Sequence, residues 1–200
     1  MERIRTAATD LFRESNFASI TTRDVARRAQ VAEATFFRYV ANKHELLALV
    51  YGDQLDALLS AVEEEDARQI SLARGAEPSL DHVVQRIHHV YRLRCDFYRL
   101  SPHNVTLYLR QGFDVDHGLS ARPVAQGDRT IRLLTSILRD GQEAGVLDPA
   151  TSMDLVAQNL HGTYMHEIDR TPVRGFDPST IWERLQPRLD VQMLPLARGG

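Results

Sequence analysis

Residues 21–43 constrain the fold of this chain more than any other stretch. They read TTRDVARRAQVAEATFFRYVANK, and Thr21 with Asp24 three positions later has the pattern of a capping box that opens a short helix. Val31 follows in a turn, and a second short helix is expected over Glu33–Tyr39. A helix of this kind is narrow enough to enter the major groove of DNA. The stretch therefore predicts a helix-turn-helix unit.

Apolar residues recur at helical spacing along the rest of the chain, and strand-like alternation is absent. We expect further helices over 2–15, 80–100 and 101–110, from about 131 to 145, and starting at Asn42, at Asp148 and at Asp177. Residues 112–127, with three glycines and a proline, predict a flexible loop, and Pro187 is expected to end the last helix early. The fold class is thus all-α. An N-terminal three-helix domain over 1–50 is joined by a long helix to a C-terminal helical domain over 51–200.

Charge is unevenly distributed along the sequence. Residues 1–50 carry eight basic and six acidic side chains, a net charge of +2, which leaves −5 on the remainder of a chain whose total is −3. A weakly basic segment on an acidic body fits a protein that contacts phosphate at one end only.

No apolar run approaches the roughly 18 residues that span a bilayer. The helical pattern begins directly after Met1, and a single cysteine permits no internal disulfide. We therefore expect a cytoplasmic protein with no membrane partner.

Hydroxyl groups and one cation flank the second short helix at spacings suited to two phosphate strands. Thr22 lies near the start of its helix, where a hydroxyl, backbone N–H groups and the helix dipole favour an anion. Thr35 and Tyr39 lie four residues apart on one face, and Lys43, the only lysine of the chain, opens the next helix. Contacts of this kind position a protein on DNA without reading its sequence.

Base reading is expected from exposed side chains around the same helix. The candidates are Arg23, Glu33, Ala34, Phe37 and Arg38. Arg23 can form a bidentate contact to guanine, and Glu33 can accept from a cytosine amino group. Ala34 and Phe37 offer apolar contact to a thymine methyl group. Charge, hydroxyl spacing and helix pattern together predict binding to double-stranded DNA.

Residues 2–55 closely resemble the N-terminal domain of the TetR family of bacterial transcriptional regulators. The shared residues are Leu11-Phe12, Thr21-Thr22, Ala26, Val31, Thr35-Phe36-Phe37-Arg38-Tyr39 and Asn42-Lys43. The resemblance implies a homodimeric, DNA-binding repressor released by a small-molecule ligand, with no enzymatic activity and no cofactor. In this family the C-terminal domain dimerises and binds the effector.

Three positions depart from the family pattern. Ala32 stands where serine is common, so the Glu33–Tyr39 helix lacks its usual cap. Glu33 replaces a basic or amide residue, and Phe37 replaces a tyrosine, which removes one hydroxyl. Phe36 is expected in the core, whereas the core and the DNA groove remain open for Phe37. The operator sequence therefore cannot be transferred from relatives.

Dimerisation would place two DNA-reading helices about 34–36 Å apart, or a multiple of this, on a near-palindromic operator. The apolar faces of 150–168 and 178–190 are candidates for a four-helix dimer seam, with packing inside the protomer as the alternative. An effector, expected to be apolar or aromatic, would lie among aromatic and polar residues. The lining candidates are His88, Tyr91, Cys95, Tyr108, His161 and Met165. Arg92 or Arg94 would balance an acidic ligand if either side chain pointed inward.

Two other functions remain open on the sequence. In one, the C-terminal domain only dimerises, and the helices after the first domain enclose no effector. In the other, a helical metal-dependent enzyme uses His161, His166 and Glu167. No histidine pair has the four-residue spacing of a helical zinc site, so no metal site is predicted.

Overall fold

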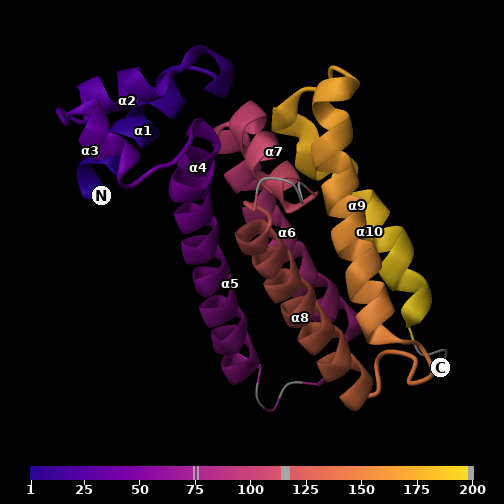
Figure 1. The fold of residues 1–200 in the computed structure, drawn as a ribbon. Coiled ribbons are helices and arrows are strands. Elements are labelled where there is room, and N and C mark those ends of the chain that lie inside the picture. Colours follow the sequence, from indigo (N-terminus) through magenta and orange to yellow (C-terminus); the bar gives the residue numbers. More distant parts are fainter. Residues whose placement is uncertain (74, 76, 114–117, 198–200) are drawn as a thin grey trace. The chain divides into compact units, whose positions relative to one another are not determined.

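The computed structural model describes residues 1–73, 75, 77–113 and 118–197. These residues form α-helices joined by turns and short 3-10 segments, and the described part of the chain contains no strand (Figure 1). The α-helices are α1 (Glu2–Glu14), α2 (Thr22–Arg28), α3 (Glu33–Phe37), α4 (Lys43–Leu47), α5 (Asp53–Leu72), α6 (Leu80–Leu100), α7 (Pro102–Arg110), α8 (Ala121–Glu143), α9 (Met153–Val173) and α10 (Ile181–Met193). The predicted all-α fold is confirmed.

The helices form two compact units. The first unit contains Met1–Ala57 and Leu100–Ala125, and the second contains Leu58–Arg99 and Gln126–Gly200. The helix-turn-helix segment therefore shares its unit with α7 and with the start of α8, which lie far away in sequence. The division into a DNA-binding domain over 1–50 and an effector-binding and dimerisation domain over 51–200 stays a prediction.

The first three helices enclose a small apolar core. Ile4, Ala8 and Phe12 recur at helical spacing along α1 and are almost completely buried. Phe36 of α3 is fully buried among them, as expected, and Val25 of α2 completes the core. Figure 1 shows α1, α2 and α3 grouped together. With such short helices, burial of these few side chains must supply most of the stability, because helices of this length are marginal alone.

The helix that begins after Asn42 is not uniform. A π-helical segment, Ala48–Gly52, separates α4 from α5. The apolar periodicity of the sequence does not indicate this interruption. Gly52 lies against the Arg122 side chain, where a Cβ atom would be 2.8 Å from the guanidinium. Arg122 donates to the Ala48 carbonyl at 3.0 Å and pairs with the Asp53 carboxylate at 2.5 Å. The side chain of Arg122, at the start of α8, thus binds to the π-helical segment.

Helix α6 is the most buried helix of the second unit. Eleven of its 21 residues are buried, and three of these are the charged or polar residues Arg86, His88 and Arg94. Arg86 donates to Asp66 of α5 at 2.7 Å and to Asp140 of α8 at 2.8 Å. Polar groups of α6 therefore bond directly to neighbouring helices.

Several predicted breaks differ from the structure. Helix α8 begins at Ala121, so much of the expected 112–127 loop is helical, and residues 114–117 of that loop lie outside the described part. Pro123 lies in the first turn, where the missing N–H donor has no intrahelical acceptor in any case. Pro187 lies inside α10, which continues to Met193 because buried leucines on both sides of the proline hold the helix in the core.

Two expected helix starts are turns instead. Asp148 accepts from the Ala150 N–H at 3.1 Å, and α9 begins only at Met153. Asp177 caps a 3-10 turn, Pro178–Thr180, that precedes α10. No helix in the described part of the chain is long and apolar enough to cross a bilayer.

The buried Arg86 pairs predict a large stability effect. Replacing Arg86 by methionine leaves two carboxylates without their cation, one of them only 10% exposed, and should cost about 3–5 kcal/mol. The control is Arg139→Met, which removes a pair with Asp154 in which both side chains are more than half exposed, and should cost at most about 1 kcal/mol. Urea unfolding measures both. Equal losses would contradict the assignment.

Candidate nucleic-acid interface

The turn between α2 and α3 has a left-handed residue. Gln30 has a φ of 54°, unusual for a residue other than glycine. The Val31 N–H closes the turn by donating to the Ala26 carbonyl at 3.0 Å. Arg3 of α1 donates to the Gln30 carbonyl at 3.0 Å and to its side-chain oxygen at 3.3 Å. The turn that sets the angle between the two helices is therefore held from the first helix.

The start of α2 is capped as the sequence predicts. The Asp24 N–H donates to the Thr21 hydroxyl at 3.1 Å, and the Thr21 N–H donates to the Asp24 carboxylate at 3.0 Å. The Thr21 side chain also donates to that carboxylate, and these bonds hold the pKa of Asp24 below its usual value. Thr22 is half-buried at the first helical position, and Arg23 beside it is exposed. The cap leaves both next to the positive end of the helix.

Helix α3 presents a mixed face to solvent. Ala34 is exposed, Thr35 is half-buried, and Phe37 is 50% exposed. Phe37 is therefore a surface residue and not part of the core, and its contact with the DNA groove stays a prediction. The helix ends at Phe37, two residues before the predicted end, and Arg38 and Tyr39 are exposed in the turn that follows. The Arg38 guanidinium lies 5.8 Å from the centre of the Tyr39 ring. Ala32 provides no side-chain cap, so the helix begins with unsatisfied N–H groups.

Two of the predicted base-reading residues contact each other. Arg23 Nε donates to the Glu33 carboxylate at 2.8 Å, and both side chains are more than half exposed. An exposed pair of this kind contributes little to stability. It does restrict the directions in which the Arg23 guanidinium can point. The unusual acidic residue at position 33 is thus a partner for the neighbouring arginine in the absence of DNA.

Lys43 is held against the 3-10 turn Phe17–Ser19. Its ammonium lies 4.1 Å from the centre of the Phe17 ring and donates to the Ala18 carbonyl at 3.4 Å. Partial burial lowers the pKa of the lysine. The Asn42 side chain accepts from the N–H groups of His44 and Glu45, which confirms the predicted cap. Lys43 therefore has a fixed position at the start of α4.

Within the first unit, α7 and the 3-10 segment Gln111–Phe113 that follows it contact the N-terminal helices through buried polar groups. Asn104, fully buried, accepts from the Phe17 N–H at 2.9 Å and donates to the Phe12 carbonyl at 3.3 Å. Gln111 donates to the His44 carbonyl at 3.0 Å. The sequence did not predict these contacts, since neither residue type nor spacing indicates a partner 67 to 92 positions away.

Three of the six predicted effector-binding residues lie together in the second unit. Tyr91 and Cys95 of α6 are buried, and the Tyr91 ring centre lies 5.6 Å from that of Tyr164 on α9. The His161 ring centre lies 6.2 Å from the same Tyr164 ring. Burial raises the pKa of the Cys95 thiol to about 12, so it stays protonated at neutral pH. Arg94 is buried beside Tyr164, with its guanidinium 4.8 Å from the ring centre.

The other three candidates lie elsewhere. His88 pairs with the Asp190 carboxylate of α10 at 2.7 Å. Tyr108 is fully buried in the first unit, and Met165 is half-buried on α9. Arg92 is exposed and lies over the Trp182 ring, so of the two arginines considered for an acidic ligand only Arg94 points inward.

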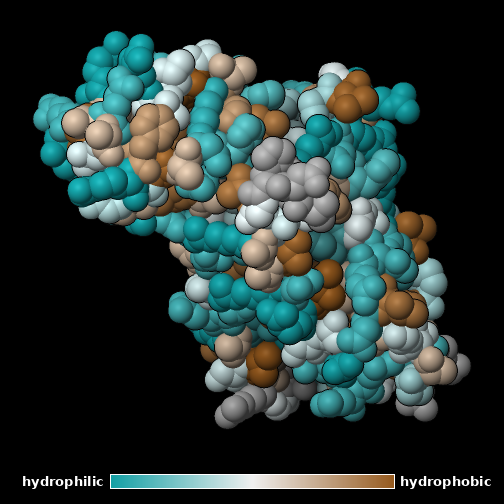
Figure 2. Space-filling view, viewed as in Figure 1, coloured by the Kyte–Doolittle hydropathy of each residue, from teal (hydrophilic) through white to brown (hydrophobic). Residues whose placement is uncertain are grey.

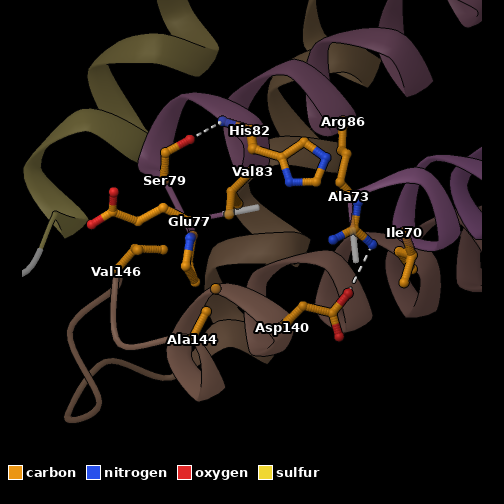
Figure 3. A pocket seen from close by; sticks show the side chains of 12 residues that line it. Ile70, Ala73, Glu77, Ser79, His82, Val83, Arg86, Asp140, Ala144 and Val146 are labelled. Atoms are coloured by element: carbon orange, nitrogen blue, oxygen red, sulfur yellow. Dashed lines mark hydrogen bonds and ion pairs between the residues drawn. The ribbon is translucent and has the colours of Figure 1, made fainter. Parts of the chain in front are cut away.

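A separate cavity of about 420 Å³ lies between the ends of α5 and α8 and the start of α6. Figure 3 shows Arg86 and Asp140 meeting at one side of it, with Glu77 on the opposite side of the view and His82 between them. None of the six predicted effector residues lines this cavity. The guanidinium at its edge is already paired with two carboxylates.

Glu167, the carboxylate of the metal-enzyme hypothesis, is fully buried among arginines. Its oxygens lie 3.2–3.4 Å from side-chain nitrogens of Arg170, Arg184 and Arg188. No group of three metal-ligating side chains occurs in the described part of the chain. The occupied carboxylate gives this hypothesis no structural support.

The predicted dimer seam requires a correction. The apolar stripe of α9, including Met153, Leu160 and Tyr164, is buried inside the protomer, as are Leu185 and Leu189 of α10. An apolar stripe at helical spacing is equally suited to either kind of packing, which is why the sequence did not separate them.

The opposite faces of α9 and α10 are exposed. Leu155 is 60%, Val191 is 68% and Leu194 is 55% exposed, and Gly162 has open space beyond its Cα. Figure 2 shows brown apolar side chains among hydrophilic ones on the side of these helices.

Comparison with known proteins agrees with this architecture. Residues 4–50 match the sequence model of bacterial regulatory proteins of the tetR family. The chain is similar to FadR of Thermus thermophilus, a TetR-family transcriptional repressor solved with lauroyl-CoA. The TM-score is 0.67 and the identity 27%, over 100% of this chain and 96% of that one.

Two more distant structures share the fold. SmeT, the repressor of the Stenotrophomonas maltophilia multidrug efflux pump SmeDEF, gives a TM-score of 0.67 at 18% identity, over 100% of this chain and 91% of that one. FadR of Bacillus subtilis, solved with stearoyl-CoA, gives 0.62 at 16%, over 94% and 96%. No protein of curated function matches this sequence.

A helix-turn-helix unit with an exposed second helix, together with a helical second unit, defines the class of helix-turn-helix transcriptional regulators. Within that class, residues 4–50 match the tetR family, and the whole chain has the fold of TetR-family transcriptional regulators. The resemblance seen in residues 2–55 is confirmed.

The two contrasting helix starts give a stability prediction. Asn42→Ala removes the acceptor of two N–H groups and should destabilise the protein by about 1 kcal/mol. Ala32→Ser supplies the missing cap of α3 and should stabilise it by a similar amount. Urea unfolding followed by circular dichroism measures both variants. A serine that stabilises nothing would show that the start of α3 is already satisfied.

Proposed function

We propose that the protein is a homodimeric transcriptional repressor that binds a near-palindromic DNA operator and is released by a small molecule. The observation that carries the proposal is the exposed face of α3, which Thr22 precedes and Lys43 follows in the sequence, each at the start of a capped helix. Thr35 and Tyr39 would contact phosphate with these two, and Ala34, Phe37 and Arg38 would face the bases.

We propose that the Arg23–Glu33 pair takes part in base recognition. Its carboxylate already orients the guanidinium in the free protein at 2.8 Å. On DNA, Arg23 would contact guanine while Glu33 either keeps the arginine in place or accepts from a cytosine amino group. Both roles make Glu33 a source of sequence preference, since an exposed carboxylate repels phosphate elsewhere.

Coupling between effector and operator would pass through α8. This helix contributes Arg122 to the first unit, where it contacts Ala48, Asp53 and Asp56 at the π-helical segment. It contributes Thr130 to the second unit, where the hydroxyl accepts from Arg94 at 2.8 Å. A ligand that changes the Arg94 contacts would favour a different position of α8, and the operator and that ligand would weaken each other reciprocally.

The exposed faces of α9 and α10 are the proposed dimer seam. Thr163 and Gln192 join the two helices at 2.9 Å, and the neighbouring Gly162 and Val191 are exposed. A glycine at the seam permits close approach of a second helix, and two helices from each copy would form a four-helix interface.

The second candidate function keeps DNA binding but gives the second unit only a dimerising role. The burial of Tyr91 and Cys95 favours it, since both are ordinary core positions. Binding of any effector to the purified dimer separates the two functions.

Loss of the Lys43 cation should weaken DNA binding uniformly. We expect Lys43→Ala to lower affinity about equally on all sequences and to reduce the slope of log K against log salt by about 0.9 per subunit, because one phosphate contact is lost. Fluorescence anisotropy on fragments selected from genomic DNA measures it. Arg132→Ala, which removes an exposed cation from α8, is the control and should leave the slope unchanged.

Arg23→Ala provides the opposite signature. It should change the preference among operator variants by about 1–3 kcal/mol at one position, because a bidentate base contact disappears. A uniform loss across all variants would assign Arg23 to phosphate instead. Absence of salt-sensitive binding to every fragment would reject the DNA-binding function as a whole.

Charge at the proposed seam should produce monomers. Leu155→Glu combined with Val191→Glu places carboxylates on exposed apolar positions, so each folded protomer remains stable while association is repelled. Leu72→Glu on α5, an equally exposed leucine, is the control. Sedimentation velocity measures the mass. A double variant that remains dimeric would place the interface elsewhere.

A further inference from the structure

Four polar atoms in the second unit are buried without a hydrogen-bond partner among the described residues. One is His89 Nε2, and the other three, the Tyr91 hydroxyl, Arg94 Nε and His161 Nδ1, lie close together. Tyr91 and Arg94 are at most 1% exposed. Buried polar groups are almost always hydrogen-bonded, and each exception costs free energy. Three such exceptions in one cluster call for a cause.

The three side chains converge on one ring. Tyr164 has Tyr91 at 5.6 Å, the Arg94 guanidinium at 4.8 Å and His161 at 6.2 Å. The Tyr164 hydroxyl itself donates to the Arg94 carbonyl at 3.3 Å and is therefore satisfied. The unsatisfied atoms thus belong to side chains that surround a single, anchored aromatic residue.

Arg94 differs from the other buried charges of this unit. Arg86 is paired with two carboxylates, and the buried Glu167 is paired with three arginines. No carboxylate among the described residues pairs with Arg94, whose partners are the Thr130 hydroxyl at 2.8 Å and the Tyr164 ring. A buried cation without an anion is costly. The guanidinium of Arg94 can therefore pair with one negative charge of a ligand.

His161 adds a hydrogen-bonding group but no charge. Burial, followed by the nearby Arg94, lowers the pKa of the imidazole to about 3, so the ring is neutral under physiological conditions. Gly127 of α8 lies against it, where a Cβ atom would be 3.3 Å from Nε2. A larger residue at position 127 would crowd the ring.

We propose that the Arg94 cluster, defined as Tyr91, Arg94, Thr130, His161 and Tyr164, binds the carboxylate of an organic acid with an apolar body. Arg94 supplies the cation, and its Nε is a donor without a present acceptor. The Tyr91 hydroxyl donates to the second carboxylate oxygen. The rings of Tyr91 and Tyr164 contact the apolar body. This inference rests on the proposed ligand-responsive function and names the chemical class of its effector.

A monoanion fits better than a phosphate. One guanidinium neutralises one negative charge, whereas a phosphate monoester would bring nearly two charges to a cluster of five residues in which Arg94 is the one cation. A neutral carbonyl compound would leave the buried cation uncompensated. The matching of a single charge is what selects a carboxylate.

The test compares acids with their neutral amides on the purified full-length protein. Isothermal titration calorimetry is run with phenylacetate, cinnamate and octanoate, each beside its primary amide. We expect at least one acid to bind at least tenfold more tightly than its amide. Equal affinities within every pair, or no binding by any acid at millimolar concentration, would overturn the proposal.

Two variants assign the selectivity to the cluster. Arg94→Met should abolish the preference for acid over amide, whereas Arg92→Met, which alters an exposed arginine on the same helix, should retain it. Tyr91→Phe keeps the test decisive if Arg94→Met does not fold. Because its hydroxyl has no partner, Tyr91→Phe should not lower the unfolding midpoint, yet it should weaken acid binding several-fold. Unchanged acid affinity in Tyr91→Phe would refute the assignment.

DNA release is measured separately. Acid binding that lowers operator affinity supports both the site and the repressor function. Acid binding without any effect on DNA supports the site and rejects the regulatory role. A protein that binds DNA but responds only to neutral compounds or to lauroyl-CoA, with equal affinity in Arg94→Met, keeps the repressor function and rejects the carboxylate site.

Discussion

Helix α6 is the most buried helix of its unit, and this burial determines which of its charged residues need partners. Arg92 on its exposed face points to water, but α6 also has buried arginines at two positions and a buried histidine between them. Each therefore needs a partner on a neighbouring helix. Arg86 binds α5 and α8, His88 binds α10, and Arg94 binds α8. The polar contacts thus specify which helices surround α6, whereas apolar packing alone would permit several arrangements.

The first unit depends on local chemistry in the same way. Its short helices bury few side chains, so caps and turn bonds decide whether they form. Thr21 and Asp24 close one helix start, Asn42 closes another, and Arg3 holds the left-handed Gln30. The two caps are close in sequence and use groups that any capped helix requires, whereas the Arg3–Gln30 contact spans 27 positions. That explains why the caps, the buried Phe36 and the helix-turn-helix pattern were predicted correctly from residues alone.

Other features were not predictable because they depend on partners far along the chain. The π-helical segment has an ordinary apolar sequence, and it becomes intelligible only with Arg122, which lies about 70 positions away. Helix α8 begins at Ala121 although its first residues include proline and glycine. The pair between Arg122 and Asp53, which the sequence does not indicate, holds this start of the helix. The apolar stripe of α9 indicated an interface equally well as a core. Sequence periodicity identifies that a face is buried, but not which surface covers it.

For the candidate effector residues too, the sequence does not distinguish a binding site from a filled core. Aromatic residues and a cysteine on α6 suggested a pocket, but Tyr91 and Cys95 alone are equally consistent with a filled core. What separates the two readings is satisfaction of hydrogen bonds, which only the structure can report. A core selected for stability alone would have paired or replaced Arg94, since an apolar residue of similar volume avoids the cost of a buried charge. Retaining the cation next to two further unsatisfied groups lowers the stability of the free protein. In the proposed mechanism, an anion that binds there would recover this free energy. Because Thr130 belongs to α8, the recovered free energy would be available to shift the helix that also carries Arg122.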